Sequence, residues 1–477
     1  MSDVLPFHLA GSRATGRDTL SVYSPWDGAE IARVSVPTPE QVERAVAALW
    51  AVRAEAQALP AHVRATALDH ISARLTERAE EFAQLITAEN GKPLSWARVE
   101  VERAASVFRW AAEEARRFSG QMQRLDTDPA GTGRLGYVRR FCRGPVLAIA
   151  PFNFPLNLVA HKVAPALAVG APILIKPAPA TPLSALLLGD LIAETNLPKG
   201  MVSVLPVPNQ AMADLVADPR LPTISFTGSG PVGWAIQAQV PRKHVTLELG
   251  GNAAVIVDAN WPDLPAAAER IALFGNYQAG QSCVSVQRVL VHADIQDEFL
   301  DLLLAAVERL RTGDPSAAGV QVGPVIDDAA ADRIISWIDE AVAAGAQLRT
   351  GGSREGRTIA PTVLTDVPAG TMLADEEVFG PVLTVRGFAD LDEAFSIVND
   401  SRYGLQAGLF STDLQVAFRA HRDLAVGGVV IGDVPSFRAD QLPYGGWKDS
   451  GVGREGVLSA MHDLTEERSL ILTGLEL

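Results

Sequence analysis

A cysteine and a glutamate set among glycines are the residues of this 477-residue sequence whose types could do covalent chemistry. Cys283 stands in GNYQAGQSCVSVQR. Glu248 lies 35 residues earlier in LELGGNAA, where the glycine pair allows close approach of the backbone. A thiolate is a strong nucleophile, and a neighbouring carboxylate can act as a base. The two residues therefore predict covalent catalysis assisted by a general base, whereas Cys142 is expected to be an ordinary buried side chain.

A glycine-rich segment supplies a second kind of chemistry. GSGPVG at 228–233 follows the strand-like TISFT and precedes the helical WAIQAQV, with Glu248 20 residues after the first glycine. This is the form of a dinucleotide-binding fingerprint, in which glycines admit a pyrophosphate to a helix N-terminus and an acid holds a ribose. One alternative is therefore a conventional Rossmann alcohol or hydroxyacid dehydrogenase that uses Gly228–Gly233. The mid-chain position of the motif and the later Cys283 argue against it, and an ordinary tight turn is a further alternative.

The composition describes a globular chain of two or more domains. Hydrophobic residues make up 48% and charged residues 20%, with a mean hydropathy of +0.13. The formal net charge of −15 would repel a phosphate backbone, so no nucleic acid partner is expected. Two cysteines cannot form a disulfide framework or a multi-cysteine zinc site, and no metal is expected. Without a signal-peptide pattern or an apolar run long enough to span a membrane, the chain is expected to be cytoplasmic, with no membrane partner.

The spacing of apolar residues indicates the elements that must position these groups. Thr38, Pro39 and Gln41 form a capping box with proline at the first helical position, so a helix begins there. Helical patterns continue over roughly 61–118. From residue 145, short Val/Ile/Leu runs alternate with helical patterns, which is typical of βαβ units. The sequence therefore predicts an α/β fold with two doubly wound parallel-sheet domains.

Seven short motifs occur in a specific order along the chain. They are PFNFPLN at 151–157, IKPAPATP at 175–182, FTGSGPVG at 226–233, LELGG at 247–251, GQSC at 280–283, EEVFGPV at 376–382 and PYGGWKDSGVGREG at 443–456. In this order and spacing, the sequence resembles the aldehyde dehydrogenase superfamily of NAD(P)-dependent enzymes almost from end to end.

The resemblance implies roles for three catalytic residues. Cys283 matches the nucleophile, which forms a thiohemiacetal and then a thioester. Asn153 matches the oxyanion residue, whose amide acts together with the backbone N–H of Cys283. Glu248 matches the base that activates water, which favours the non-acylating, hydrolytic branch over release to coenzyme A. The implied reaction converts an aldehyde, NAD(P)+ and water into a carboxylic acid and NAD(P)H; a catalytically inactive structural homologue is the non-enzymatic alternative.

The resemblance also implies the cofactor contacts. Lys176 would bind the adenosine ribose, and Glu377 and Phe379 would bind the nicotinamide ribose and ring. The loop on the phosphate side contributes Gly228, Ser229 and Gly233.

One departure from the family pattern concerns the choice of cofactor. Many members that prefer NAD carry Glu three residues after the lysine, where this chain has Pro179. Proline removes an acceptor for the ribose diol and also a charge that would repel a 2′-phosphate. Both NAD and NADP therefore stay open, with a slight preference for NAD.

Two arginines are candidates for binding the substrate. Arg438 precedes the PYGG motif and resembles positions near the substrate entrance of relatives that act on small polar or anionic aldehydes. Arg109, in the helical SVFRWAAEEARR, is expected to face the same pocket. A guanidinium binds carboxylate, phosphonate or sulfonate in a fork. The alternative for both residues is an ordinary surface ion pair.

The family architecture implies how the chain is divided. A nucleotide-binding domain would comprise 1–122 and 142–250, and a catalytic domain 251–440. The remaining ranges, 123–141 and 441–477, would form a small β oligomerisation arm and the C-terminal segment. Alternation in the arm is compatible with exposed ribbons that need a partner strand, so a homodimer or homotetramer is predicted.

Overall fold

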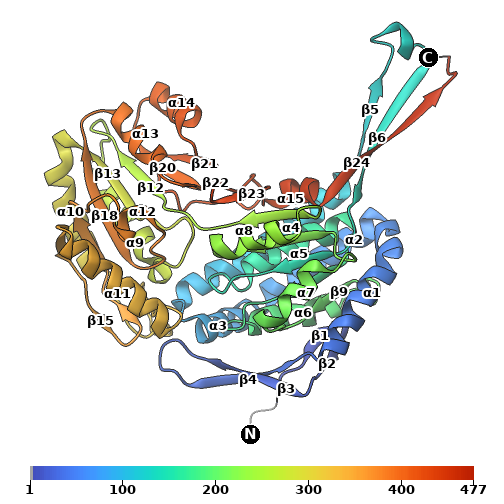
Figure 1. Ribbon diagram of the computed structural model, residues 1–477, viewed down its shortest axis with the longest axis horizontal. Coiled ribbons are helices and arrows are strands. Elements are labelled where there is room, and N and C mark those ends of the chain that lie inside the picture. The colour runs from blue at the N-terminus through green and yellow to red at the C-terminus, as the bar shows by residue number, and fades with distance from the viewer. Residues whose placement is uncertain (1–3, 477) are drawn as a thin grey trace.

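The computed structural model describes residues 4–476. It contains two α/β units, each built on one large sheet, and a three-stranded arm that projects from the first unit (Figure 1). The predicted α/β fold class with two parallel-sheet domains is thereby confirmed. The first long helix, α1 (Pro39–Ala58), begins as predicted, because Thr38 and Gln41 make the reciprocal hydrogen bonds of a capping box.

The first domain is built on an eight-stranded sheet in the order β2-β1-β9-β8-β7-β10-β11-β23. Strands β9, β8, β7, β10 and β11 are parallel, while β1, β2 and β23 pair antiparallel at the edges. Parallel strands covered on both faces are apolar runs, and every residue of β7, β8 and β9 is buried. The strands are β1 (Phe7–Leu9), β2 (Ser12–Ala14), β7 (Val146–Ile149), β8 (Ile173–Lys176), β9 (Val202–Val204), β10 (Thr223–Thr227), β11 (His244–Glu248) and β23 (Gly451–Val452).

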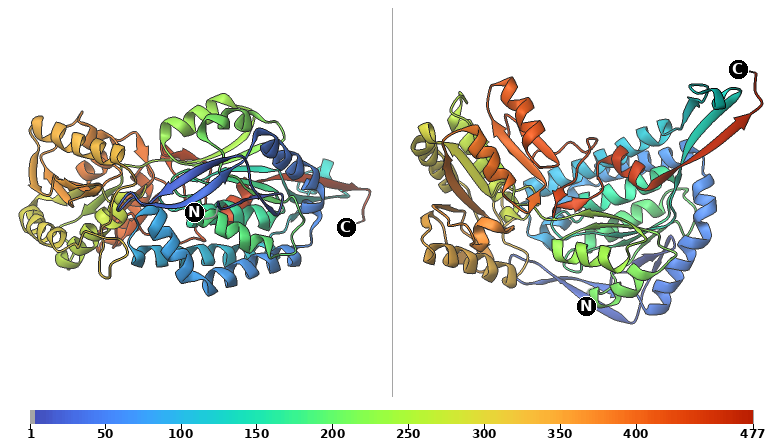
Figure 2. Two further views of the ribbon diagram at one scale, coloured as in Figure 1. Left: turned by 90° about the horizontal axis from the view of Figure 1, so that it is seen from below. Right: turned by 45° about the horizontal axis from the view of Figure 1, so that its top comes forward.

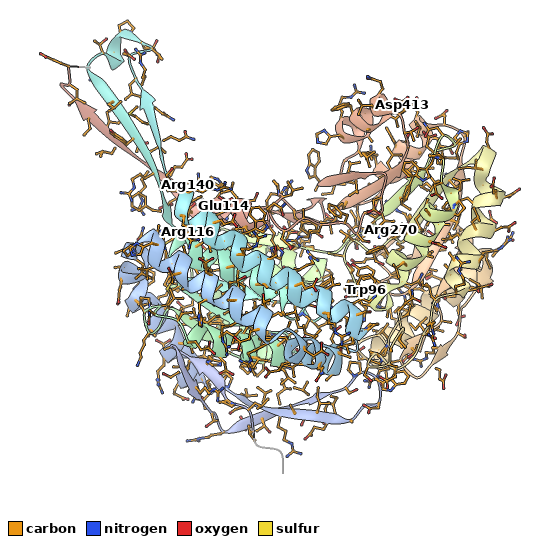
Figure 3. All side chains as sticks on the ribbon, turned by 180° about the vertical axis from the view of Figure 1, so that it is seen from behind. Trp96, Glu114, Arg116, Arg140, Arg270 and Asp413 are labelled. Atoms are coloured by element: carbon orange, nitrogen blue, oxygen red, sulfur yellow. The ribbon has the colours of Figure 1, made fainter. Side chains whose placement is uncertain are left out.

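Helices cover both faces of this sheet (Figure 2). On one face, α2 and α4 lie side by side, and α5 is buried between them and the sheet (Figure 3). The helices besides α1 are α2 (Ala61–Glu77), α3 (Ala79–Asn90), α4 (Leu94–Arg117), α5 (Asn157–Val169), α6 (Leu183–Ala193), α7 (Met212–Ala217), α8 (Gly230–Gln239) and α15 (Val457–Asp463). A two-stranded ribbon, β3 (Asp18–Tyr23) and β4 (Glu30–Val36), lies along the bottom of the molecule in Figure 1.

The second domain is built on a seven-stranded sheet in the order β14-β17-β18-β13-β12-β20-β21, parallel except for β14. Its strands are β12 (Ala254–Val257), β13 (Arg288–His292), β14 (Gln347–Thr350), β17 (Thr362–Thr365), β18 (Val382–Phe388), β20 (Gln406–Phe410) and β21 (Gly428–Ile431). Its helices are α9 (Leu264–Asn276), α10 (Gln296–Glu308), α11 (Asp328–Ala343), α12 (Met372–Asp375), α13 (Leu391–Asn399) and α14 (Leu414–Asp423). Two further short strand pairings are β15 (Arg354–Glu355) with β16 (Thr358–Ile359), and β19 (Tyr403–Gly404) with β22 (Trp447–Lys448). Trp96 of α4 joins the domains by packing on Phe274 and Tyr277 (Figure 3).

The arm is an antiparallel ribbon of β5 (Gln121–Arg124), β6 (Arg134–Cys142) and β24 (Thr465–Thr473). It joins two segments that lie more than 300 residues apart in the sequence, and its tip points away from both domains (Figures 1 and 2). Not all of the C-terminal segment belongs to the arm, because β23 and α15 pack on the first domain. Within residues 4–476, no helix is long and apolar enough to cross a membrane.

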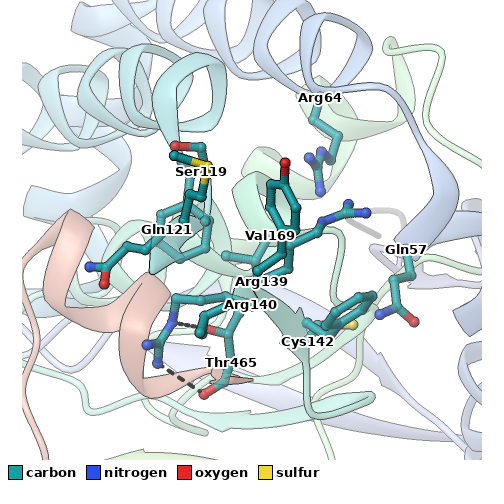
Figure 4. A pocket seen from close by; sticks show the side chains of 15 residues that line it. Gln57, Arg64, Ser119, Gln121, Arg139, Arg140, Cys142, Val169 and Thr465 are labelled. Carbon is teal, nitrogen blue, oxygen red and sulfur yellow. Dashed lines mark hydrogen bonds between the residues drawn. The ribbon is translucent and has the colours of Figure 1, made fainter. Parts of the chain in front are cut away.

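A cavity of about 550 Å³ lies where the arm meets the first domain (Figure 4). It is lined by Arg64, Arg139 and Cys142, among others, and by none of the residues predicted for the active site. Cys142 is buried there, and burial raises the pKa of its thiol. Its environment therefore matches the ordinary buried side chain expected from the sequence.

Candidate active site

The predicted catalytic residues meet where strands of the first sheet end. Glu248 is the last residue of β11, and Asn153 follows β7 by four residues. The carboxyl ends of parallel strands share one edge of a sheet, and ligands of such sheets bind there. Cys283 comes from the second domain, after a short turn that follows α9. The site therefore lies between the two domains and needs both of them.

The turn before Cys283 has a strained backbone. Residues 278–280 have φ values of 42°, 58° and 69°, so two non-glycine residues adopt the left-handed conformation in a row. Glycine is required at the third position, since a Cβ on Gly280 would collide with the carbonyl of Gly380. Strain of this kind persists only where the surrounding structure enforces it, and it is concentrated at functional sites.

Asn153 is tied to this same turn. Its Nδ2 donates to the carbonyl oxygen of Gln281 at 2.9 Å, two residues before Cys283, and its side chain is buried. Gln278 donates to the same carbonyl at 3.0 Å. The amide predicted to stabilise an oxyanion is thus held beside the predicted nucleophile by a contact between the domains.

Cys283 lies against Tyr444. Its Sγ is 3.1 Å from the tyrosine hydroxyl oxygen. Burial raises the pKa of the thiol, and the hydrogen bond with Tyr444 opposes this increase. The backbone of Gly251 also lies close to that of Cys283, because a Cβ on Gly251 would lie 2.6 Å from the carbonyl oxygen of Cys283. The glycine pair singled out in the sequence therefore allows this approach.

Glu248 is a buried carboxylate without partners. Its exposed fraction is 3%, and neither carboxylate oxygen has a hydrogen-bond partner among residues 4–476. Burial, followed by the charge of Glu455, raises its pKa well above the ordinary value. Room for the side chain depends on Gly445, whose Cβ would lie 2.9 Å from Oε1. A carboxylate kept free of partners and with a raised pKa is suited to accept a proton near neutral pH.

A buried lysine and glutamate lie next to Glu248, and both were missed in the sequence. Lys162 Nζ is 3.1 Å from Glu455 Oε1 and also donates to Ser225 at 3.0 Å and Thr227 at 2.7 Å. The signal for Lys162 was available, because it is a charge in α5, a helix in which every residue is buried. Glu455 stands within the recognised PYGGWKDSGVGREG motif, but nothing in the pattern marked it as a partner.

Arg438 links the network formed by Lys162 and Glu455 to Tyr444. Its guanidinium carbon lies 3.8 Å from the centre of the Tyr444 ring, and its Nη2 donates to Glu455 Oε2 at 3.1 Å. Nη2 also lies 3.3 Å from His161 Nδ1. The Nε of Arg438 is buried without a partner among residues 4–476. Of the two arginines predicted to bind substrate, the structure brings Arg438 to the cysteine.

Arg109 lies elsewhere. Its side chain is 52% exposed, pairs with Glu113 at 2.9 Å and stacks on Trp110. The α4 arginine that reaches the network is Arg103, whose Nη2 is 2.7 Å from Asp440 Oδ1. Six residues are about one and two-thirds helical turns, so these two arginines leave α4 on different faces. The predicted residue therefore lies on the helix that contributes to this network, but on a different face of that helix from Arg103.

A buried histidine, His161, lies next to the Arg438 guanidinium. His161 Nε2 lies 3.1 Å from Asp440 Oδ1, which also accepts the hydrogen bond from Arg103. Burial, followed by the charge of Arg438, lowers the pKa of His161 to about 4. The ring is therefore neutral at pH 7, with a proton on Nε2 and an acceptor at Nδ1 facing Arg438.

The residues predicted for the ribose contacts are buried polar groups. Lys176, the last residue of β8, donates to Asn209 at 2.6 Å, and burial lowers its pKa to about 8. Glu377 accepts from the backbone N–H of Gly251 at 3.0 Å, and burial raises its pKa to about 7. Phe379 has a φ of 47° and packs edge-to-face on Phe152 at 5.9 Å.

The glycine-rich loop runs from β10 to the start of α8. The N–H of Gly228 donates to the carbonyl of Glu248 at 3.1 Å, which ties the loop to the strand that carries the predicted base. Ser229 is the N-cap of α8, but its side chain makes no capping bond. Gly233 packs against Leu249, where a Cβ would be 3.3 Å from Phe226. Uncapped N–H groups at a helix N-terminus suit a phosphate, so this loop fits a nucleotide cofactor.

The family model described as "Aldehyde dehydrogenase family" matches residues 12–470 of the chain. The chain belongs to the aldehyde dehydrogenase family. It is therefore an oxidoreductase that uses a nicotinamide cofactor to oxidise an aldehyde. Family membership sets aside the conventional Rossmann alternative, in which Glu248 would hold a ribose.

Relatives of this aldehyde dehydrogenase cover nearly its whole length. It is 39% identical over 466 residues to a 3-sulfolactaldehyde dehydrogenase of Priestia aryabhattai, covering 98% of this chain and 97% of the relative. The crystal structure of aldehyde dehydrogenase 21 from Physcomitrella patens, in complex with the reaction product succinate, matches with 42% identity and a TM-score of 0.98 over 99% of each chain. An NADP-dependent glyceraldehyde-3-phosphate dehydrogenase from Bacillus halodurans C-125, complexed with NADP, matches with 32% identity and a TM-score of 0.95, covering 99% of this chain and 100% of the other.

Proposed function

We propose that this aldehyde dehydrogenase oxidises a short aldehyde carrying an anionic group to its free carboxylic acid. The observation that carries the proposal is the position of Arg438, which is buried, has an unpartnered Nε, and is separated from Cys283 by a single phenol ring. A buried donor without a partner is costly, so the free Nε supports a ligand that accepts a hydrogen bond there. A short anionic aldehyde would place its charge at Arg438 and its carbonyl at Cys283.

The names of the relatives support this class of substrate. The first names a sulfonated aldehyde, the second a complex with the dicarboxylate succinate, and the third a phosphorylated aldehyde. All three carry an anionic group. A guanidinium binds each of these groups in the same way, by paired N–H donors.

In the proposed mechanism, the Cys283 thiolate attacks the aldehyde carbon and the carbonyl oxygen becomes an alkoxide. Asn153, held beside the cysteine turn, and the backbone N–H of Cys283 are the proposed donors to this alkoxide; losing one such donor typically costs about 2.7–4 kcal/mol of transition-state stabilisation. Bound NAD(P)+ supplies the hydride acceptor. Glu248 then removes a proton from the water that attacks the thioester, which releases the acid and restores the Cys283 sulfur.

For the cofactor, we propose contacts with Lys176, Glu377, Phe379 and the loop that contains Gly228, Ser229 and Gly233. NAD and NADP are both accepted in this proposal, with a slight preference for NAD. Pro179 supports dual use, because it presents no carboxylate that would repel a 2′-phosphate. Comparing kcat/KM for the two cofactors tests this part.

For the whole chain, we propose that 1–122 with 142–250 binds the cofactor and that 251–440 carries the nucleophile. The arm, formed from 123–141 and part of 441–477, would join protomers into a homodimer or homotetramer. Exposed apolar side chains on the arm support this role. A cytoplasmic location is proposed from the two free cysteines, which suit a reducing compartment.

The test compares two arginine variants on two substrates. Arg438→Gln is expected to lower kcat/KM for an anionic aldehyde such as succinic semialdehyde by about 10²-fold, since a buried charge-assisted contact contributes about 2–5 kcal/mol. With neutral butyraldehyde, kcat/KM should change by only a few-fold. Arg109→Gln, which removes an exposed ion pair, should change neither value. Equal losses on both aldehydes for Arg438→Gln would sink the proposal, and a selective loss for Arg109→Gln would restore Arg109 as a substrate contact.

A further inference from the structure

Tyr444 is the side-chain partner of the predicted nucleophile. Its hydroxyl oxygen lies 3.1 Å from Cys283 Sγ. Among residues 4–476, neither the sulfur nor this hydroxyl makes another side-chain hydrogen bond. The contact is buried, since Tyr444 is 7% exposed and packs with Val284 and Leu405 around the cysteine.

The chemistry of the two groups determines which one donates. A thiolate has no proton and can only accept a hydrogen bond. Burial raises the pKa of Tyr444 well above its ordinary value, so the phenol keeps its proton at neutral pH. When Cys283 is ionised, the tyrosine is therefore the donor and the sulfur the acceptor.

Contacts of the Tyr444 backbone, of its ring and of the next residue hold this tyrosine in place. Its backbone exchanges two hydrogen bonds with Glu455, at 2.9 Å and 2.7 Å. The Arg438 guanidinium lies on the face of the ring at 3.8 Å. The next residue, Gly445, has a φ of 157° and lies against Glu248. A hydroxyl held in this way loses little conformational freedom when it makes a hydrogen bond, which favours a functional contact over a chance one.

We propose that the Tyr444 hydroxyl is a catalytic hydrogen-bond donor that stabilises the attacking thiolate of Cys283. No covalent bond of Tyr444 forms or breaks; the tyrosine acts on the anion that remains after the thiol has released its proton to the solvent. The inference rests on the proposed role of Cys283 as nucleophile. The inference assigns a chemical role to the Tyr444 hydroxyl. The Tyr444 ring has a separate, structural role, because the Arg438 guanidinium packs on it.

The test measures alkylation of Cys283 in the full chain, without substrate or cofactor. The thiolate displaces iodide from iodoacetamide and forms an S–C bond, so the rate follows the thiolate fraction. The rate is measured from pH 6 to pH 11 on the peptide that contains Cys283, by mass spectrometry. In Tyr444→Phe, the midpoint of the pH profile should rise by about one to two pH units, the size expected when a hydrogen bond to a charged group is lost. At pH 7.5 this slows alkylation by about tenfold or more, while the rates converge at high pH.

Tyr277→Phe is the matched control. Tyr277 is also buried beside the cysteine turn, but its hydroxyl makes no hydrogen bond to the sulfur. Its midpoint should stay within a few tenths of a pH unit of the unaltered chain. Two results would overturn the inference: an unchanged midpoint in Tyr444→Phe, or an alkylation rate that is lowered by the same factor at every pH. In either case the ring would only pack against Cys283 and would not stabilise the thiolate. Should Tyr444→Phe fail to fold, Tyr444→His keeps a donor on a ring, and a midpoint below that of Tyr444→Leu supports the donor role; equal midpoints overturn it.

A Cys283 variant distinguishes an error in the proposed nucleophile from an error in the role of Tyr444. If Cys283→Ser keeps the dehydrogenase activity, the proposed nucleophile is wrong and the role of Tyr444 falls with it. If Cys283→Ser is inactive and the alkylation midpoint of Tyr444→Phe does not move, only the inference about Tyr444 is wrong.

Discussion

At the scale of single residues, the site depends on a few side chains that are buried without complete pairing. Neither oxygen of Glu248 has a partner among residues 4–476, and one guanidinium nitrogen of Arg438 has none. Such groups lower the stability of the folded chain, by about 1–3 kcal/mol each. They are retained where a ligand or a reacting group will pair with them, which is the arrangement expected around an aldehyde and a hydrolytic water.

The proposed role of Glu248 as the base leads to a prediction about two successive steps. Glu248→Gln has nearly the same size but cannot accept a proton, so kcat should fall by about 10²–10⁴-fold. The first turnover of NAD(P)H should still appear as a burst, because acylation of Cys283 comes before the step that needs the base. Stopped-flow absorbance at the reduced nicotinamide band measures both phases. Loss of the burst together with turnover would show that Glu248 acts before hydrolysis.

At the scale of elements, two helices near the site receive their caps from distant carboxylates. The N-cap residues of α5 and α6 make no side-chain capping bond. Instead, Glu100 accepts from the N–H groups of Leu156 and Asn157 at 2.9 Å and 3.0 Å. It also pairs with the buried Lys92. Because α5 begins directly after the segment that carries Asn153, this contact helps to position the predicted oxyanion residue.

Glu89 caps α6 and leads to a prediction about pH. It accepts from the N–H groups of Leu183 and Ser184 and from the Ser184 hydroxyl, and burial raises its pKa to about 7. The folded chain therefore holds a proton that the unfolded chain has released between about pH 4.5 and 7. In that window, the contribution of Glu89 to the free energy of unfolding falls as pH rises. From pH 5 to pH 8 the loss should be about 2 kcal/mol.

The measurement for Glu89 compares melting temperatures of the unaltered chain and Glu89→Gln at pH 5 and pH 8. Glutamine does not titrate, so the stability advantage of the unaltered chain should shrink as pH rises. Glu89 contacts no predicted catalytic residue, and the exposed Glu113→Gln is the control for a general effect of charge. A difference that stays constant or grows with pH would contradict the raised pKa of Glu89.

At the scale of the whole molecule, the arm exposes several of its apolar residues. Leu470 and Ile471 of β24 are 58% and 57% exposed, and Met122 of β5 is 64% exposed. Successive residues of a strand point to opposite faces, so both faces of this ribbon present apolar side chains. An isolated ribbon of this kind is an aggregation hazard unless another chain covers it.

The arm leads to a prediction about assembly. Leu470→Glu combined with Ile471→Glu should shift the chain from a dimer or tetramer to a smaller species, because charges in an apolar interface are not paired. Light scattering coupled to size-exclusion chromatography measures the mass. Val342→Glu, on exposed α11 of the second domain, is the matched control and should leave the mass unchanged. A monomeric unaltered chain, or a mass unaffected by the arm variant, would contradict the oligomerisation role.

Much of the architecture follows from local sequence. The capping box at Thr38 sets the start of α1, and the alternation of apolar runs with helical patterns defines the two parallel-sheet domains. The ordered motifs also indicate the family, and the comparison with known proteins confirmed this assignment. These features depend on residues close together in the chain, where backbone geometry and periodicity act directly.

The contacts that complete the site depend on the tertiary structure. Cys283 and Tyr444 lie 161 residues apart in the chain, and Lys162 and Glu455 lie 293 apart. Helical periodicity groups residues on one face but does not say which neighbour that face meets, so the sequence pointed to Arg109 although Arg103 reaches the network. The sequence by itself determined the fold class, the family and the residues proposed for the chemistry. Which side chains surround them was decided only when two domains and the C-terminal segment packed together, because burial and charge pairing are properties of that packing.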